Sequence, residues 1–135
     1  MSKTFWRRGI AASEMAVLAP FLVLLLFGAH DVAQVMSTTI RLERAARVGA
    51  QLAIVNPQDL SAVRSAVIAA APGLTEANVP MPVQSCECAS AAVLCTASCA
   101  SGLTQIVTVS ASKPLTALLL SDRQSGVGNA VVRIR

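Results

Sequence analysis

The chain has 135 residues, of which 54% are hydrophobic and only 13% are charged. This length and composition suit one membrane segment followed by one small domain, and they exclude an array of several domains. The net charge of +4 comes mainly from Lys3, Arg7 and Arg8, because the rest of the chain has eight basic and seven acidic residues. A basic surface for an acidic partner is therefore not indicated.

The first predicted element is an apolar helix that runs from Ile10 to Ala29. Its length of about 20 residues is what a helix needs to cross a bilayer. Basic residues precede this run, and His30 and Asp31 follow it. Because an excess of Lys and Arg marks the cytoplasmic side, the chain is predicted to cross once and to carry the rest of its length outside the cytoplasm.

Glu14 places a carboxylate inside this apolar run. A charge within a membrane segment costs roughly 2.5–3.5 kcal/mol even on insertion scales, so its presence indicates a function. It lies five residues after Gly9. That spacing makes the hypothesis of a function for Glu14 more specific.

Residues Arg8 to Pro20 read RGIAASEMAVLAP, and Ala45 to Ala53 read AARVGAQLA. The first segment resembles the type IV prepilin processing signal, and both together resemble TadE-like pseudopilins of tight-adherence (Tad) systems. The resemblance implies that a prepilin peptidase cuts after Gly9, so that Ile10 becomes the first mature residue. It also implies that Glu14 neutralises the terminal amine of a neighbouring subunit.

By this resemblance the chain is expected to be a minor pseudopilin, a structural or assembly subunit of a Tad-type pilus. It would be anchored in the bacterial inner membrane with a cytoplasmic N-terminus and a periplasmic head, and could enter an extracellular pilus. The implied partners are the prepilin peptidase, other pilin or pseudopilin subunits, the pilus assembly platform and the lipid bilayer.

Two alternatives compete with this interpretation. A secretory signal also combines a basic region with an apolar core, but cleavage after Ala29 or Ala33 would place Phe27 or Asp31 where a small residue is needed. A generic single-pass, membrane-anchored extracytoplasmic binding module is the other alternative. It predicts no cleavage at Gly9 and tolerance of Glu14→Ala.

The helical pattern continues beyond the membrane to about Val55. A helix from Ile10 to Val55 would be roughly 70 Å long. Ala45, Gly49 and Ala53 fall on one face of it and allow close approach of another backbone. The predicted organisation is a leader at 1–9, a long helix at 10–55 that spans the membrane at about 10–30, and a head at 56–135.

The head is predicted to be α+β, with one helix packed on an antiparallel sheet of about three strands. Asn56 and Pro57 are expected to start the helix, which runs to about Ala71. Gly126 to Gly128 is interpreted as a turn before the last strand. The expected strands are Val79–Gln84, Leu103–Ser112 and Ala130–Ile134.

Four cysteines, Cys86, Cys88, Cys95 and Cys99, cluster in the head. In an oxidising compartment they are expected to form two disulfides that staple a small core. Pairing Cys86 with Cys88 would close a very tight loop, which leaves nested (86–99, 88–95) or crossed (86–95, 88–99) links. A zinc site is a weaker alternative, because the spacing is not a standard zinc pattern.

The sequence offers little to catalysis. His30 is the only histidine, and the SxxK match at Ser110 to Lys113 lacks its companion motifs. Aromatic residues are absent from Gly28 to Arg135, so stacking on nucleic-acid bases is not expected. The chain is expected to be no enzyme and to bind no cofactor, metal ion or nucleic acid.

Overall fold

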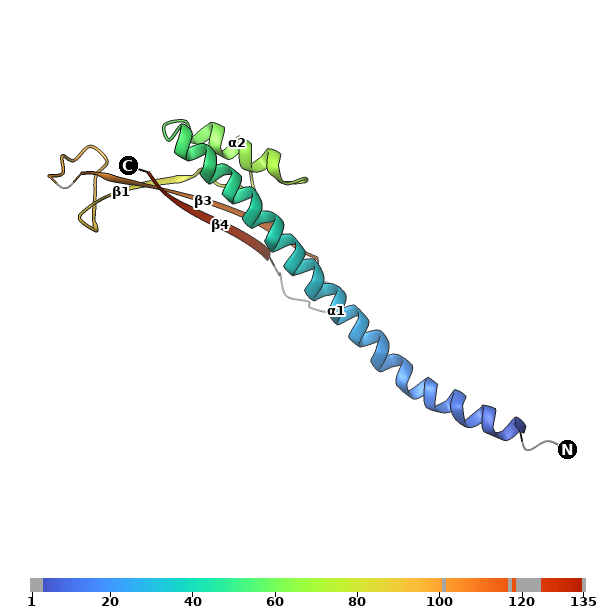
Figure 1. Ribbon diagram of the computed structural model, residues 1–135. Helices are drawn as coiled ribbons and strands as arrows, with labels where there is room; N and C mark the ends of the chain where they lie inside the picture. Colours follow the sequence, from blue (N-terminus) through green and yellow to red (C-terminus); the bar gives the residue numbers. More distant parts are fainter. Residues whose placement is uncertain (1–3, 101, 117, 119–124, 135) are drawn as a thin grey trace.

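The computed structural model describes residues 4–100, 102–116, 118 and 125–134, with side chains from residue 12 onward. It consists of a long helix whose C-terminal half is built into a small head (Figure 1). The helix, α1, spans Thr4–Val55 and includes Pro20. At 1.5 Å per residue it is about 78 Å long. We call residues 4–30 of α1 the arm and the remainder of the described chain the head.

The second helix, α2 (Leu60–Ala70), begins later than the sequence pattern predicts. The N–H of Asn56 donates to the carbonyl of Leu52 at 2.9 Å, so Asn56 completes the last turn of α1 instead of capping α2. Pro57 then lies in the turn between the two helices. The predicted start of the helix was wrong because one polar residue can end a helix as readily as it can begin one.

Asp59 is the N-cap of α2. Its carboxylate accepts hydrogen bonds from the hydroxyl of Ser61 at 2.6 Å and from the backbone N–H of Ala62 at 2.9 Å. Both bonds favour the ionised carboxylate, and together they hold the pKa of Asp59 below its ordinary value, with Ser61 making the larger contribution. The cap thus satisfies a donor in the first turn of α2.

Four antiparallel strands form one sheet in the order β2-β1-β3-β4. They are β1 (Val83–Cys88), β2 (Ala91–Val93), β3 (Thr104–Pro114) and β4 (Ser125–Ile134). The predicted α+β class, with a helix and an antiparallel sheet, is confirmed. The sheet has a fourth strand, β2, which the sequence did not reveal because it is only three residues long.

The turn between β1 and β2 also lacks the usual sequence signal. Ala89 and Ser90 both have positive φ, 50° and 72°, as in a tight two-residue hairpin. That conformation favours Gly or Asn, so a hairpin is not expected from Ala-Ser. The first predicted strand was also misplaced: β1 begins at Val83, after Pro80 and Pro82, which have no N–H for a ladder.

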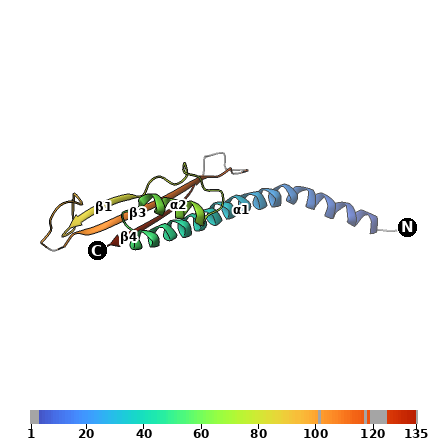
Figure 2. The ribbon, with the colours of Figure 1, turned by 90° about the horizontal axis from the view of Figure 1, so that it is seen from above.

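Both helices cover one face of the sheet, as the two views together show (Figures 1 and 2). Alternate residues of β3 point into this layer, and its hydrophobic cluster consists of aliphatic side chains. The largest fully buried side chains besides Cys86 are Leu42, Val63, Val67, Val79, Val107 and Val109. Since no aromatic residue is available, small side chains let the layers approach closely.

Glycines in β4 make the closest of these approaches. Gly126 and Gly128 lie within β4 and not in a turn before it, so that interpretation of the sequence was wrong. A Cβ at Gly128 would lie less than 3.0 Å from the backbone of Leu42 and Glu43 in α1. Only glycine therefore lets β4 pass this close to the long helix.

Arg64 ties α2 to the segment that leads into β1, a role that the sequence pattern did not indicate. Its Nε donates to the carbonyl of Val79 at 2.7 Å and its Nη2 to the carbonyl of Glu76 at 2.6 Å. The guanidinium also pairs with the carboxylate of Glu76 at 3.3 Å. One half-buried cation thus satisfies carbonyls in a segment that has no ladder partners of its own.

Candidate functional site: the exposed arm

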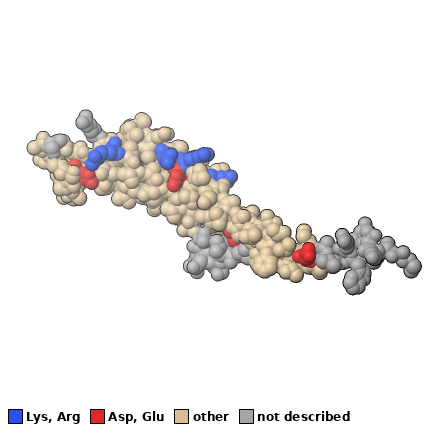
Figure 3. Space-filling view, turned by 60° about the horizontal axis from the view of Figure 1, so that its bottom comes forward, with Lys and Arg blue, Asp and Glu red and all other residues tan. Residues whose placement is uncertain are grey.

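The described side chains of the arm lie outside the hydrophobic core of the head. Every side chain from Ala12 to Phe27 is exposed, although the segment is strongly apolar. Ten of these are large hydrophobic side chains, between 44% and 70% exposed. In Figure 3 the basic side chains drawn in blue on the visible face all lie over the head. Such a surface needs lipid or other apolar helices around it.

The balance of energies favours membrane insertion despite Glu14. Removing ten large apolar side chains from water contributes on the order of 10 kcal/mol or more. A carboxylate in the membrane costs roughly 2.5–3.5 kcal/mol on the insertion scale. The apolar contribution exceeds this cost. The helix is also long and apolar enough to cross a bilayer, and it is the one such helix among the described residues. This suggests single-pass membrane anchoring.

Glu14 is exposed on the arm. Three ion pairs form among the described side chains: Arg47 with Glu43, Arg64 with Glu76 and Arg133 with Glu87. Glu14 takes part in none of them. Its carboxylate is thus presented outward on an apolar helix, where a partner from another molecule could reach it.

The residues of the expected processing site lie in the same helix. Because α1 begins at Thr4, Gly9 and Ile10 are both helical. Ile10 and Glu14 are four residues apart, so they lie on one face about 6 Å apart along the axis. The structure does not describe the leader residue Lys3 or the side chains of Arg7, Arg8 and Ile10.

The small residues predicted to allow close helix packing are buried inside the head. Ala45 and Ala53 are 1% and 0% exposed, and Gly49 lies between them on the same face. A Cβ at Gly49 would overlap the side chain of Val67 in α2. In this structure, the backbone that approaches this face of α1 is the chain's own second helix.

At the far end of the head from the arm, the four cysteines form the crossed pair of disulfides. Cys86 is linked to Cys95 and Cys88 to Cys99, with Cα atoms 5.1 and 5.9 Å apart. Cys86 and Cys88 lie two residues apart on β1 and so share a face of that strand. The links hold a segment of mostly exposed residues against the end of the sheet.

The pairing can be checked by removing cysteines two at a time. Replacing Cys86 and Cys95 together by serine is expected to leave no free thiol, since Cys88 and Cys99 stay linked. Replacing Cys86 and Cys99 together is expected to leave two thiols that alkylation and mass measurement detect. The reverse pattern would establish the nested pairing instead.

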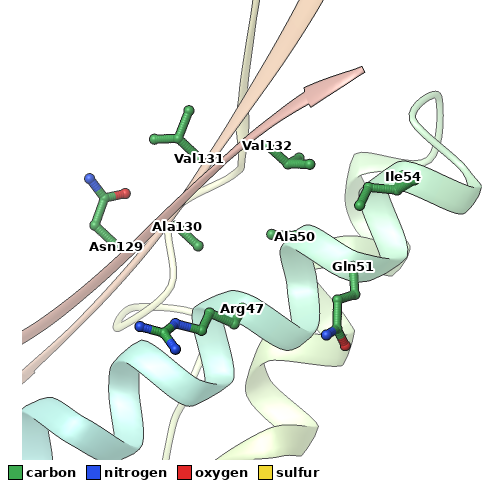
Figure 4. Close-up of a pocket in the computed structure, with 8 residues that line it drawn as sticks. All are labelled: Arg47, Ala50, Gln51, Ile54, Asn129, Ala130, Val131 and Val132. Carbon is green, nitrogen blue, oxygen red and sulfur yellow. The ribbon is translucent and has the colours of Figure 1, made fainter. Parts of the chain in front are cut away.

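A groove lies between α1 and the outer strand β4. Its volume is about 380 Å³, and Ala130 and Val132 point from β4 toward the helix while Val131 points away (Figure 4). The lining is Arg47, Ala50, Gln51, Ile54, Asn129, Ala130, Val131 and Val132. This lining contains one cation and no carboxylate, histidine or thiol, so it offers no acid–base pair for catalysis.

Other candidate chemistry in the described residues is equally sparse. Ser110 and Lys113 both lie in β3, three residues apart, so their side chains point to opposite faces. His30 accepts a hydrogen bond from Gln34 at 2.9 Å on the exposed helix surface. Within the described residues, no group of three or more His, Cys, Asp or Glu side chains is arranged to hold a metal ion.

The geometry of the arm is that of an exposed, apolar helix of bilayer length. Residues 9–51 match the model of the TadE-like protein family. The resemblance read from the sequence is thereby confirmed. This TadE-like segment begins at Gly9 and ends four residues before the end of α1, so it is about a third of the chain and consists of the long helix.

The family suggests a membrane protein associated with Tad pili, of a structural or assembly type not known as enzymatic. No curated protein and no solved structure matches the chain. The head beyond Val55, with its disulfides, lies outside the TadE-like segment. The family likeness therefore concerns the arm and the part of α1 that packs against the sheet.

Proposed function

We propose that this chain is a minor pseudopilin that serves as a structural or assembly subunit of a Tad-type pilus. The arm anchors it in the bacterial inner membrane, with the N-terminus in the cytoplasm and the head in the periplasm. The match of residues 9–51 to the TadE-like family is the observation that carries this proposal. The exposed arm supports it, because an apolar helix of this kind suits both a bilayer and the interior of a helical filament.

In this proposal, prepilin peptidase hydrolyses the peptide bond between Gly9 and Ile10 and so releases the basic leader. The leader carboxylate leaves with Gly9, and Ile10 acquires a free amine. Glu14 of one subunit then pairs with the Ile10 amine of the next. Each charge offsets the cost of burying the other among apolar helices. The assembly platform and other pilin subunits are the partners that this step requires.

The outward position of Glu14 supports an intermolecular role. Ile10 and Glu14 are about one helical turn apart. If two neighbouring arms are offset along their axes by about one turn, Glu14 of one arm lies level with Ile10 of the other. Until cleavage, the nitrogen of Ile10 is part of a peptide bond and carries no positive charge. The charge partner of Glu14 is therefore created by processing.

The proposal predicts that the mature protein begins at Ile10. In cells with a working prepilin peptidase, the mass of the membrane-extracted chain is expected to correspond to residues 10–135, with or without one methyl group. A strain that lacks the peptidase is the control and is expected to yield the chain from Met1. An intact Met1 terminus in the competent strain would contradict the proposal and favour a generic membrane-anchored binding module.

A further inference from the structure

Asp31 is a buried carboxylate at the end of the arm. It is only 3% exposed, whereas the neighbouring His30 and Val32 are both exposed. Both of its oxygens accept a hydrogen bond from the backbone N–H of Leu118, each at 3.1 Å. Asp31 and Leu118 are 87 residues apart in sequence. The carboxylate thus holds the backbone of Leu118 against α1 at this level.

This level coincides with the expected surface of the membrane. The apolar run ends at Ala29, two residues before Asp31, which is a rise of about 3 Å along the helix. The polar layer of a bilayer adds roughly 5–7 Å on each side of the hydrocarbon core. The backbone of Leu118 therefore lies within the thickness of the headgroup layer when the arm spans the membrane.

The side chain of Leu118 has no place in the core of the head, since it is 66% exposed. Val32 and Met36 on α1 are also exposed, at 48% and 62%, so apolar surface continues from the arm past this level. In the sequence, Leu119 and Leu120 follow Leu118 but lie outside the described residues. A leucine held in the headgroup layer can bury its side chain in the adjoining hydrocarbon.

We propose that Leu118 is a second membrane contact, held against the bilayer interface by Asp31. The partner is the lipid itself, because the contact is continuous with the membrane-spanning helix and lies at the depth of the headgroups. Two points of attachment, the arm and Leu118, restrict the tilt and rotation of the head above the membrane. The inference rests on the membrane anchoring in the proposed function and does not depend on a pilus role.

The test uses a single tryptophan as a depth probe in the full-length chain. In a Trp6→Phe background, Leu118→Trp is reconstituted at low density in phosphatidylcholine vesicles whose acyl chains carry bromine. Fluorescence quenching of Leu118→Trp is expected to be severalfold greater than that of Leu94→Trp. Leu94 is the matched control, because it is 79% exposed and lies in the disulfide-linked segment at the far end of the head.

Leu22→Trp, in the middle of the arm, reports insertion of the arm into the bilayer separately from the membrane contact of Leu118. Strong quenching of Leu22→Trp with Leu118→Trp as weakly quenched as Leu94→Trp would overturn the second contact and leave the anchoring intact. Absence of quenching at Leu22→Trp would instead refute the anchoring on which the inference rests. If the tryptophan of Leu118→Trp is removed from water only at high protein density, its partner is a neighbouring subunit. That result would also overturn the lipid contact.

The role of Asp31 is tested in the same assay. Asp31→Ala is expected to reduce quenching of Leu118→Trp severalfold, whereas Asp31→Asn, which keeps a carbonyl acceptor, is expected to retain most of it. Circular dichroism of each variant verifies that the head is folded. Unchanged quenching in a folded Asp31→Ala variant would overturn the anchoring role of this carboxylate.

Discussion

Glu14→Ala is expected to leave membrane insertion intact and to abolish incorporation into pili. Removal of the carboxylate makes the arm more apolar, so insertion is unaffected. In the filament it would leave the Ile10 amine of a neighbouring subunit without its counter-charge. An unpaired charge in such a setting costs about 3–5 kcal/mol, roughly a hundredfold to several thousandfold in the association constant.

The measurement is the amount of subunit in sheared filaments relative to the membrane fraction. Glu43→Ala is the matched control, because Glu43 is a carboxylate on the same helix whose pair with Arg47 is solvent-exposed and 3.9 Å long. That pair contributes only a few tenths of a kcal/mol, so near-normal incorporation is expected. Normal incorporation of Glu14→Ala would refute the proposed ion pair.

Gly128→Ala is expected to destabilise the head by about 3 kcal/mol, the upper end of the range for overpacked sites. The added methyl group would meet the backbone of Leu42 and Glu43, which cannot rotate away as a side chain can. For a domain of this size, the unfolding temperature is expected to fall by roughly 12–24 °C. Thermal unfolding of the full-length chain in detergent micelles, followed by circular dichroism, measures the change.

Two other glycines provide a graded control for this prediction. At Gly126, the nearest atom to an added Cβ is a side-chain carbon of Thr38 at 3.0 Å, so Gly126→Ala is expected to have a smaller effect. At Gly28 nothing lies within 4 Å, and alanine there is expected to leave the unfolding temperature unchanged or slightly higher. Equal unfolding temperatures for the Gly128 and Gly28 variants would show that β4 does not pass so close to α1.

The contact at Gly128 also bears on function. Because β4 lies along α1, the sheet is fixed to the helix that is long and apolar enough to cross a membrane (Figure 1). A change in the tilt of α1 is therefore expected to move the sheet with it. The match to the TadE-like family covers residues 9–51 of this helix and does not extend to the sheet.

Part of this architecture could be predicted because its causes are local. The apolar length of the arm, the charge at Glu14 and its spacing from Gly9 can all be read along one helix, where neighbours in sequence are neighbours in space. The helix ending near Ala71 was predicted for the same reason, although its start was placed too early, and its Val63 and Val67 are fully buried. The α+β class followed from the same alternation of helical and strand patterns.

Errors arose where a pattern has two meanings. Gly126 and Gly128 resemble a turn, but glycine also permits close approach of a strand to a helix, and only the position of α1 shows which applies. Asn56 resembles an N-cap, yet its N–H completes the preceding helix. The short strand β2 was missed because Ala89 and Ser90 carry no turn signal.

By itself, the sequence determined the arm: its apolar length, the carboxylate of Glu14 within it and its likeness to TadE-like proteins. Only the tertiary structure decided which cysteines pair, where β4 crosses α1, and that Asp31 holds Leu118 at the end of the arm. These features join residues up to 87 positions apart. No local pattern encodes such a contact, because it depends on the packing of the whole chain.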